Sequence, residues 1–199
     1  MLNRALTIIH DEHRSLGAVL HGLRFLVREA LDKGRELDFK LMWAMIYYMD
    51  AFSQRLHDPR EETYLFARLR ERTHDADEII ATLEKQHADS AEQRRRLEQL
   101  LGQLEAGIPG SLETLVNEVE QQVEDARQHM KLEETTVIPL AKKFLTTEDW
   151  IGIAEAFGEH GDPRFGAKPE HEFRDLFTRI VNLAPNAALI VANSDTTRP

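Results

Sequence analysis

The 199-residue sequence contains no cysteine. This absence excludes disulfide bonds, thiolate zinc sites, iron–sulfur ligation by the chain and a thiol nucleophile. The chain also lacks any apolar run near the roughly 20 residues that a membrane-spanning helix needs. Basic residues are fewer than acidic ones, with 25 lysine and arginine residues against 35 aspartate and glutamate residues. The net charge of −10 argues against nucleic acid or an anionic membrane as the main partner.

The length suits one domain, or one domain with an appendage. A hydrophobic share of 42% is enough for a substantial core. Near the N-terminus, Asp11 and Glu12 introduce charge too early for a signal peptide. We therefore expect a soluble, cytoplasmic protein.

Helical periodicity dominates the first 145 residues, because apolar residues recur at alternating steps of three and four. The pattern predicts a first helix that ends at residues 32–34 and a second from about 38 to 72. Pro59 lies inside the second helix, where its missing amide donor should bend the helix. A third stripe runs from Ile80 to Leu104, and a fourth helix opens at Ser111 as a plausible N-cap. Four such helices joined by short turns predict an all-α, up-down-up-down four-helix bundle.

Three regions are predicted from these patterns. The bundle takes residues 1–145, a short C-terminal helical appendage takes 146–185, and a flexible tail takes 186–199. A fifth helix should start near Thr146, followed by a loop over 158–169 and a short sixth helix. The apolar residues of the appendage could form either a cap or a dimer surface, and the sequence does not decide between them. These residues are Trp150, Phe157, Phe165, Phe173 and Phe177.

One sequence motif occurs twice, as His57-x-x-x-Glu61-Glu-Thr and as His129-x-x-x-Glu133-Glu-Thr. Residues four apart on a helix lie on one face, so each motif places an imidazole and a carboxylate side by side. Each motif also follows a lone histidine on an apolar stripe, with His13 before the first motif and His87 before the second. This order indicates a duplicated two-helix unit and predicts a two-metal site.

A cation accounts for such a core better than hydrogen bonds alone. Burying a carboxylate without a partner costs several kcal/mol, and a metal pair removes that cost. Imidazole and carboxylate ligands without sulfur suit iron, manganese or zinc. Two carboxylates shared by four imidazoles favour bridging and leave a position open for dioxygen, peroxide or nitric oxide. The predicted metal ligands are His13, His57, Glu61, His87, His129 and Glu133. Alternatively, the carboxylates could face solvent and the histidines could be hydrogen-bonded core residues.

Other residues compete for these roles. His10, one turn before His13, could reach the same cavity, whereas His21 is too far along the helix axis to share one metal pair. His74 and Glu78 repeat the His-x-x-x-Glu spacing, but they lie near a helix start, so a solvated helix end is the better interpretation. Glu84-x-x-His87 matches half of the ferritin-type carboxylate signature and appears once, which disfavours a ferritin-like oxidase.

Over about residues 5 to 145, the ordered His, His-x-x-x-Glu, His, His-x-x-x-Glu pattern resembles the hemerythrin-like (HHE cation-binding) domain. The resemblance implies a non-haem di-iron centre in a four-helix bundle, with Glu61 and Glu133 as bridges and the four histidines as terminal ligands. Classical oxygen carriers have a paired His-x-x-x-His on the third helix, where this chain has Leu83 before His87. The pattern is closer to bacterial hemerythrin-like proteins and to the di-iron domain of iron–sulfur cluster repair proteins, although no cysteine-bearing N-terminal domain is present.

The leading functional hypothesis is the binding or sensing of a small oxidant (dioxygen, peroxide or nitric oxide) at two iron ions. The alternatives are enzymatic turnover of peroxide or nitric oxide, iron supply to damaged iron–sulfur clusters, and a structural bundle with incidental zinc. The expected partner is a small molecule rather than nucleic acid or membrane, and a homodimer is possible.

Overall fold

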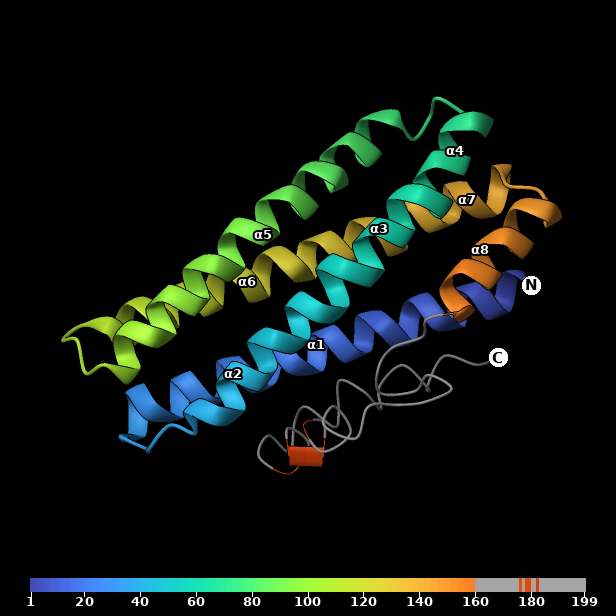
Figure 1. Ribbon diagram of the computed structural model, residues 1–199. Helices are drawn as coiled ribbons and strands as arrows, with labels where there is room; N and C mark the ends of the chain where they lie inside the picture. Colours follow the sequence, from blue (N-terminus) through green and yellow to red (C-terminus); the bar gives the residue numbers. More distant parts are fainter. Residues whose placement is uncertain (160–175, 177, 180–181, 183–199) are drawn as a thin grey trace.

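The computed structural model describes residues 1–159, 176, 178–179 and 182, and the regular structure in this part is entirely helical (Figure 1). Its helices pack as an antiparallel bundle, which confirms the predicted all-α fold. The elements are α1 (Leu2–Lys33), α2 (Phe39–Tyr48), η1 (Met49–His57), α3 (Asp58–Arg60), η2 (Glu61–Phe66), α4 (Ala67–Arg72), α5 (Asp77–Glu105), α6 (Ser111–Leu132), η3 (Glu133–Val137), α7 (Ile138–Phe144) and α8 (Thr147–Glu159).

The second and fourth long helices of the bundle are not uniform α-helices. The second runs through α2, η1, α3, η2 and α4, and the fourth through α6, η3 and α7, where η marks π-helical winding. The second contains Pro59 between its two π-helical segments, and the fourth contains Pro139 just after its single one. Proline lacks the amide that an α-helical hydrogen bond needs. The sequence predicted a bend at Pro59, and the structure shows π-helical winding on both sides of it.

Short turns with defined caps connect the long helices. Gly34 ends α1 with a left-handed φ of 63°, and its amide donates to the carbonyl of Ala30. Asp38 then caps α2, because its carboxylate accepts from the amide of Leu41 at 2.9 Å. The expected cap at Ser111 is wrong: Gly110 (φ 78°) occupies the cap position, and the Ser111 hydroxyl donates to the carbonyl of Ile108.

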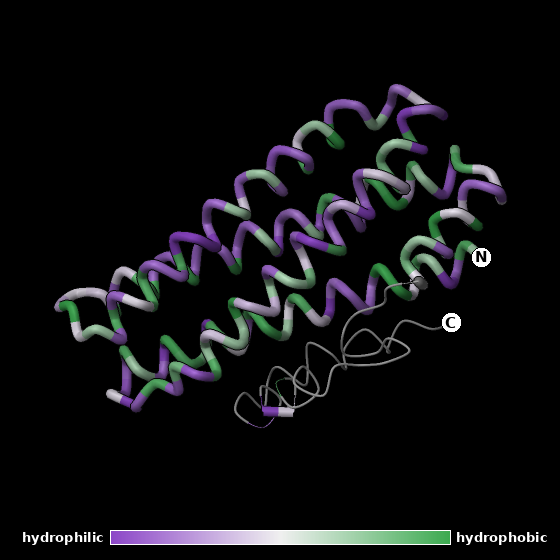
Figure 2. Tube along the Cα trace, in the orientation of Figure 1, coloured by the Kyte–Doolittle hydropathy of each residue, from purple (hydrophilic) through white to green (hydrophobic). Residues whose placement is uncertain are grey.

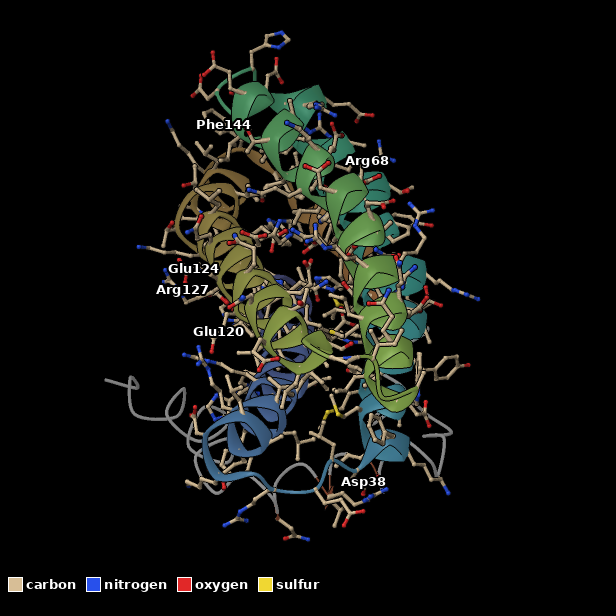
Figure 3. All side chains as sticks on the ribbon, turned by 90° about the vertical axis from the view of Figure 1, so that its left-hand side faces the viewer. Asp38, Arg68, Glu120, Glu124, Arg127 and Phe144 are labelled. Carbon is tan, nitrogen blue, oxygen red and sulfur yellow. The ribbon has the colours of Figure 1, made fainter. Side chains whose placement is uncertain are left out.

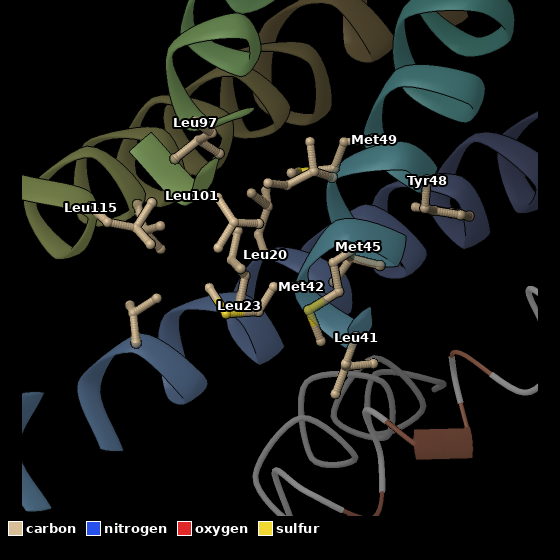
Figure 4. Packing of buried hydrophobic residues seen from close by; sticks show 14 of the residues in the cluster. Leu20, Leu23, Leu41, Met42, Met45, Tyr48, Met49, Leu97, Leu101 and Leu115 are labelled. Carbon is tan, nitrogen blue, oxygen red and sulfur yellow. The ribbon is translucent and has the colours of Figure 1, made fainter. Parts of the chain in front are cut away.

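Two apolar clusters fill the bundle interior, one towards each end. Figure 4 shows the first, in which Leu20 and Leu23 of α1 meet Met42 and Met45 of α2. The second includes Phe66 and residues of α5, α7 and α8. Along the long helices, hydrophilic and hydrophobic residues are interspersed at short intervals (Figure 2), as expected for helices that bury one face.

Helix α8 folds back along the start of α1 (Figure 1). It begins as predicted after Thr146, whose hydroxyl accepts from the amide of Asp149 while the Asp149 carboxylate accepts from the amide of Thr146. Trp150, Ile153 and Phe157 are buried in the second apolar cluster, so they act as a cap on the bundle.

Other predictions for the C-terminal region have mixed outcomes. The predicted loop start at residue 158 is wrong, because α8 continues to Glu159. Phe165, Phe173, Phe177 and most of the predicted sixth helix lie outside the described residues, and the predicted domain boundaries stay predictions. Within the described part, no helix is both long and apolar enough to cross a membrane.

Replacing Phe157 by alanine should destabilise the protein by about 3–5 kcal/mol, because its fully buried ring would leave a cavity between α8 and the bundle. Urea unfolding followed by circular dichroism measures this change. Tyr64→Ala is the matched control, since Tyr64 is 43% exposed and its loss should cost far less. Equal losses for the two variants would contradict the role of α8 as a packed cap.

Candidate metal centre

A layer of polar side chains crosses the middle of the bundle between the two apolar clusters. In Figure 3, side-chain nitrogen and oxygen atoms gather between the helices about halfway along the bundle. Glu61 and Glu133 are 0% and 1% exposed there, and each begins a π-helical segment. π-Helical turns are frequent at functional sites. The layer contains all six predicted ligands: His13 from α1, His57 from η1, Glu61 from η2, His87 from α5, His129 from α6 and Glu133 from η3.

Glu61 directs its two oxygens to different imidazoles. Its Oε1 lies 3.3 Å from Nε2 of His57 and 3.7 Å from Nε2 of His13. Its Oε2 lies 3.6 Å from Nε2 of His87. One carboxylate therefore faces histidines from both halves of the duplicated sequence.

Glu133, in the second half of the duplicated sequence, also directs its two oxygens to different imidazoles. Its Oε2 lies 3.1 Å from Nε2 of His13, and its Oε1 lies 3.0 Å from Nε2 of His129. The ligand atoms thus form two groups that share Glu61. One group contains His13 and His57, and the other contains His87, His129 and Glu133. Glu133 also contacts His13 of the first group.

These spacings fit a metal site better than a hydrogen-bonded core. Ligands about 2.1 Å from one ion and at right angles to each other lie about 3 Å apart. Among the described residues, neither oxygen of Glu61 or Glu133 has a hydrogen-bond partner, and neither does Nε2 of His13. The atoms are close without hydrogen-bond geometry, as expected where their lone pairs converge on a cation.

The Nδ1–H group of each imidazole, on the side away from the candidate metal position, donates a hydrogen bond to a side-chain oxygen. Nδ1–H of His57 donates to Oε2 of Glu12 at 2.7 Å, and Nδ1–H of His129 donates to the amide oxygen of Gln86 at 2.8 Å. Such contacts fix the tautomer and the ring orientation of histidines that bind metals. They also leave Nε2 of each ring with a lone pair.

The lone histidines are held in the same way. Nδ1–H of His87 donates to Glu62 at 2.8 Å, and Nδ1–H of His13 donates to Glu134 at 3.2 Å. The Nε2 atoms of His87 and His129 then face each other at 3.1 Å. With Nδ1–H on both rings, the two Nε2 lone pairs would repel each other at that distance, so a proton or a metal ion between the rings would stabilise the arrangement.

The sequence pattern did not predict the four acceptors, which are Glu12, Gln86, Glu62 and Glu134. Their sequence positions repeat, because Glu12 and Gln86 each immediately precede a lone histidine, and Glu62 and Glu134 each follow the glutamate of the repeated motif. The acceptors therefore occupy corresponding positions in the two halves of the duplicated sequence.

Protons can partly fill the layer in the absence of metal. Burial by itself would lower the pKa of His57, but the charges of Glu61 and Glu12 outweigh it and raise this pKa to about 9. The carboxylates of Glu133, Glu134 and Glu61 likewise overcome burial and raise the pKa of His13 well above its ordinary value. Burial and the charge of Glu133 raise the pKa of Glu61.

A cavity of about 270 Å³ reaches the layer from within the bundle. All four histidines line it. Its other walls include polar groups, such as Gln54, Ser90 and Arg94, and apolar ones, such as Leu20 and Met49. A small molecule in this cavity would therefore be in contact with the candidate ligands.

The competing residues lie elsewhere. His10 is exposed and His21 is half-buried, while His13 is in the layer. His74 is 92% exposed and pairs with Asp77, as expected for a solvated helix end. Glu84 pairs with Arg70 rather than with His87.

Leu83, one turn before His87 on α5, is fully buried in the second apolar cluster. It occupies the position where a fifth histidine would stand in a His-x-x-x-His pair. The candidate ligands in the layer, among the described residues, are accordingly four histidines and two glutamates.

Comparison with known proteins agrees with this geometry. No curated protein and no solved structure matches the chain. The model of one family does match, the hemerythrin HHE cation-binding domain, over residues 4–141. The match covers all six candidate ligands and more than half of the chain. The protein therefore belongs to the hemerythrin HHE cation-binding family.

Proposed function

We propose that the polar layer holds two iron ions and that the pair binds or senses a small oxidant. One observation carries the proposal: each buried carboxylate offers one oxygen to the His13–His57 pair and the other to the His87–His129 pair. Two ions held by these residues would satisfy the four carboxylate oxygens of Glu61 and Glu133, which have no hydrogen-bond partner among the described residues.

The chemistry of the ligands favours iron. Two histidines with carboxylates and open positions are typical of non-haem ferrous sites, and the absence of sulfur removes the ligands that select copper(I) or structural zinc. The His13–His57 group includes Glu61, and the His87–His129 group includes both Glu61 and Glu133. With four or fewer protein ligands, each ion would have room for an exogenous ligand.

Bound ferrous iron would supply the electrons that dioxygen, peroxide or nitric oxide accepts. The chain supplies the surroundings. Glu12, Gln86, Glu62 and Glu134 hold the imidazoles in the tautomer that binds metal. The apolar clusters on both sides exclude bulk water, and the cavity brings a small ligand to the four histidines.

Burial favours retention of iron over its donation. The two carboxylates are at most 1% exposed, and losing the ions would leave their charges without compensation. Iron supply to damaged clusters requires easy release, so this function is less well supported. Consumption of peroxide or nitric oxide at the same site stays the alternative, since it needs only a supply of electrons.

Purified protein reconstituted anaerobically with ferrous iron should bind two irons per chain. Aerobic exposure should then give a near-ultraviolet absorption band that disappears on reduction. His129→Ala should lower the iron content and abolish this band, because it removes a ligand from one group. His74→Ala, which removes an exposed histidine, is the matched control and should behave as wild type. Little or no iron in the reconstituted wild-type protein would overturn the proposal.

The stability of the metal-free protein should depend on pH through its buried histidines. A raised pKa stabilises fully below the unfolded value of about 6.5, and the effect is lost as the pH rises through the folded value, about 9 for His57. For His57 alone the loss is on the order of 3 kcal/mol. Urea unfolding at pH 6.5, 8 and 9.5 measures it.

Metal-loaded protein should not show this decline, because the ions replace the protons. His57→Gln should flatten the decline in the metal-free protein, whereas His74→Gln should leave it unchanged. A metal-free protein equally stable from pH 6.5 to 9.5 would contradict the expectation.

A further inference from the structure

The two halves of the metal centre match at every ligand but differ at one supporting residue. Glu12 precedes His13 and accepts from His57, while Gln86 precedes His87 and accepts from His129. The two acceptors occupy corresponding positions in the duplicated unit. One is a carboxylate and the other is a neutral amide.

This difference changes how strongly each imidazole can donate to a metal. A hydrogen bond to a carboxylate is about twice as strong as one between neutral groups. It draws the Nδ1 proton towards the acceptor and makes Nε2 a more basic ligand. Nε2 of His57 is therefore the stronger donor, and Nε2 of His129 is the weaker one.

Arg60 moderates the contrast without removing it. Its guanidinium donates to Oε1 of Glu12 at 3.2 Å, while Oε2 accepts from His57 at 2.7 Å. The ion pair offsets the cost of burying this carboxylate, which is 1% exposed. The oxygen nearest His57 remains a charged acceptor in direct contact with the ring.

The remaining acceptors do not add to the contrast. Glu62 supports His87 and Glu134 supports His13, so each half receives one such carboxylate. Both of these side chains are 42% exposed. Among the four acceptors, the chemical difference between the halves is thus concentrated at residues 12 and 86.

We infer that the two metal positions are unequal: the His13–His57 position binds its ion more tightly than the His87–His129 position, and Glu12 and Gln86 set this order. The inference rests on the proposed pair of ions. Glu12 and Gln86 act as positioning residues, since each contacts a ligand rather than the metal. Substitutions of such residues typically change metal affinity by 10–100-fold.

The test is an anaerobic titration with ferrous iron in competition with a chromophoric chelator, which yields two stepwise dissociation constants. Wild-type values alone do not decide, because even identical sites give separated steps. Gln86→Glu gives the second half the same acceptor as the first, and it should tighten the weaker constant about tenfold. The tighter constant should stay within about twofold.

Gln99→Glu is the matched control, because it adds the same charge to α5 at an exposed position. It lies about 20 Å along the helix from residue 86. This variant should leave both constants at their wild-type values. A similar tightening by Gln86→Glu and Gln99→Glu would mean that overall charge, not the hydrogen bond, is responsible, and it would overturn the inference.

Glu12→Gln is the reciprocal variant and should weaken the tighter constant about tenfold. If it fails to fold because Arg60 loses its partner, as circular dichroism would show, Gln86→Glu still decides. No change, or an equal change in both constants, for Gln86→Glu overturns the inequality while the pair of ions stands. Failure of the wild-type protein to bind iron would overturn the proposed function instead.

Discussion

Two carboxylates in the middle of this bundle have no hydrogen-bond partner in the part of the chain that the structure describes, and they face four imidazoles. Removing such charges from water costs several kcal/mol each unless a counter-charge is present. Positive charge is therefore a structural requirement of the layer, supplied either by protons on the histidines or by metal ions. The raised pKa of His57 is the same requirement seen in the metal-free protein.

Much of the remaining fold covers this polar layer with apolar side chains and holds its residues in position. Apolar clusters lie on both sides of it, and a low effective dielectric strengthens the attraction between the ligands and a cation. Phe157 of α8 packs against both the ring of His57 and the guanidinium of Arg60. Helix α8 thus extends the apolar cover to the charged pair behind His57.

Local periodicity explains why much of this was predictable from the sequence. His-x-x-x-Glu spans one helical turn, and His13 and His87 occupy apolar stripes, so their inward direction could be inferred from spacing alone. The π-helical winding at Glu61 and Glu133 could not be inferred from spacing, because it depends on which backbone hydrogen bonds form in the folded state. Nor could the role of Trp150 and Phe157, since a stripe of apolar residues does not say which surface it covers.

The supporting acceptors were hidden for a different reason. Glu12 and Gln86 are adjacent to lone histidines, so they project about 100° away on the helix and look like ordinary polar neighbours. Only the packing of the second helix against the first, and of the fourth against the third, brings them to His57 and His129. Their role depends on contacts between helices, which one helix's pattern does not contain.

The break in the duplication also adjoins the cavity. Gln86 and His129 both line the cavity, whereas Glu12 pairs with Arg60 beneath α8. A second carboxylate at position 86 would add negative charge to the cavity wall. It would also strengthen the hold of His129 on its ion. With a neutral amide at position 86, His129 would be the weaker donor of the proposed centre, in a cavity that all four histidines line. The duplicated unit would thus combine ligands of the same type with unequal supports at residues 12 and 86.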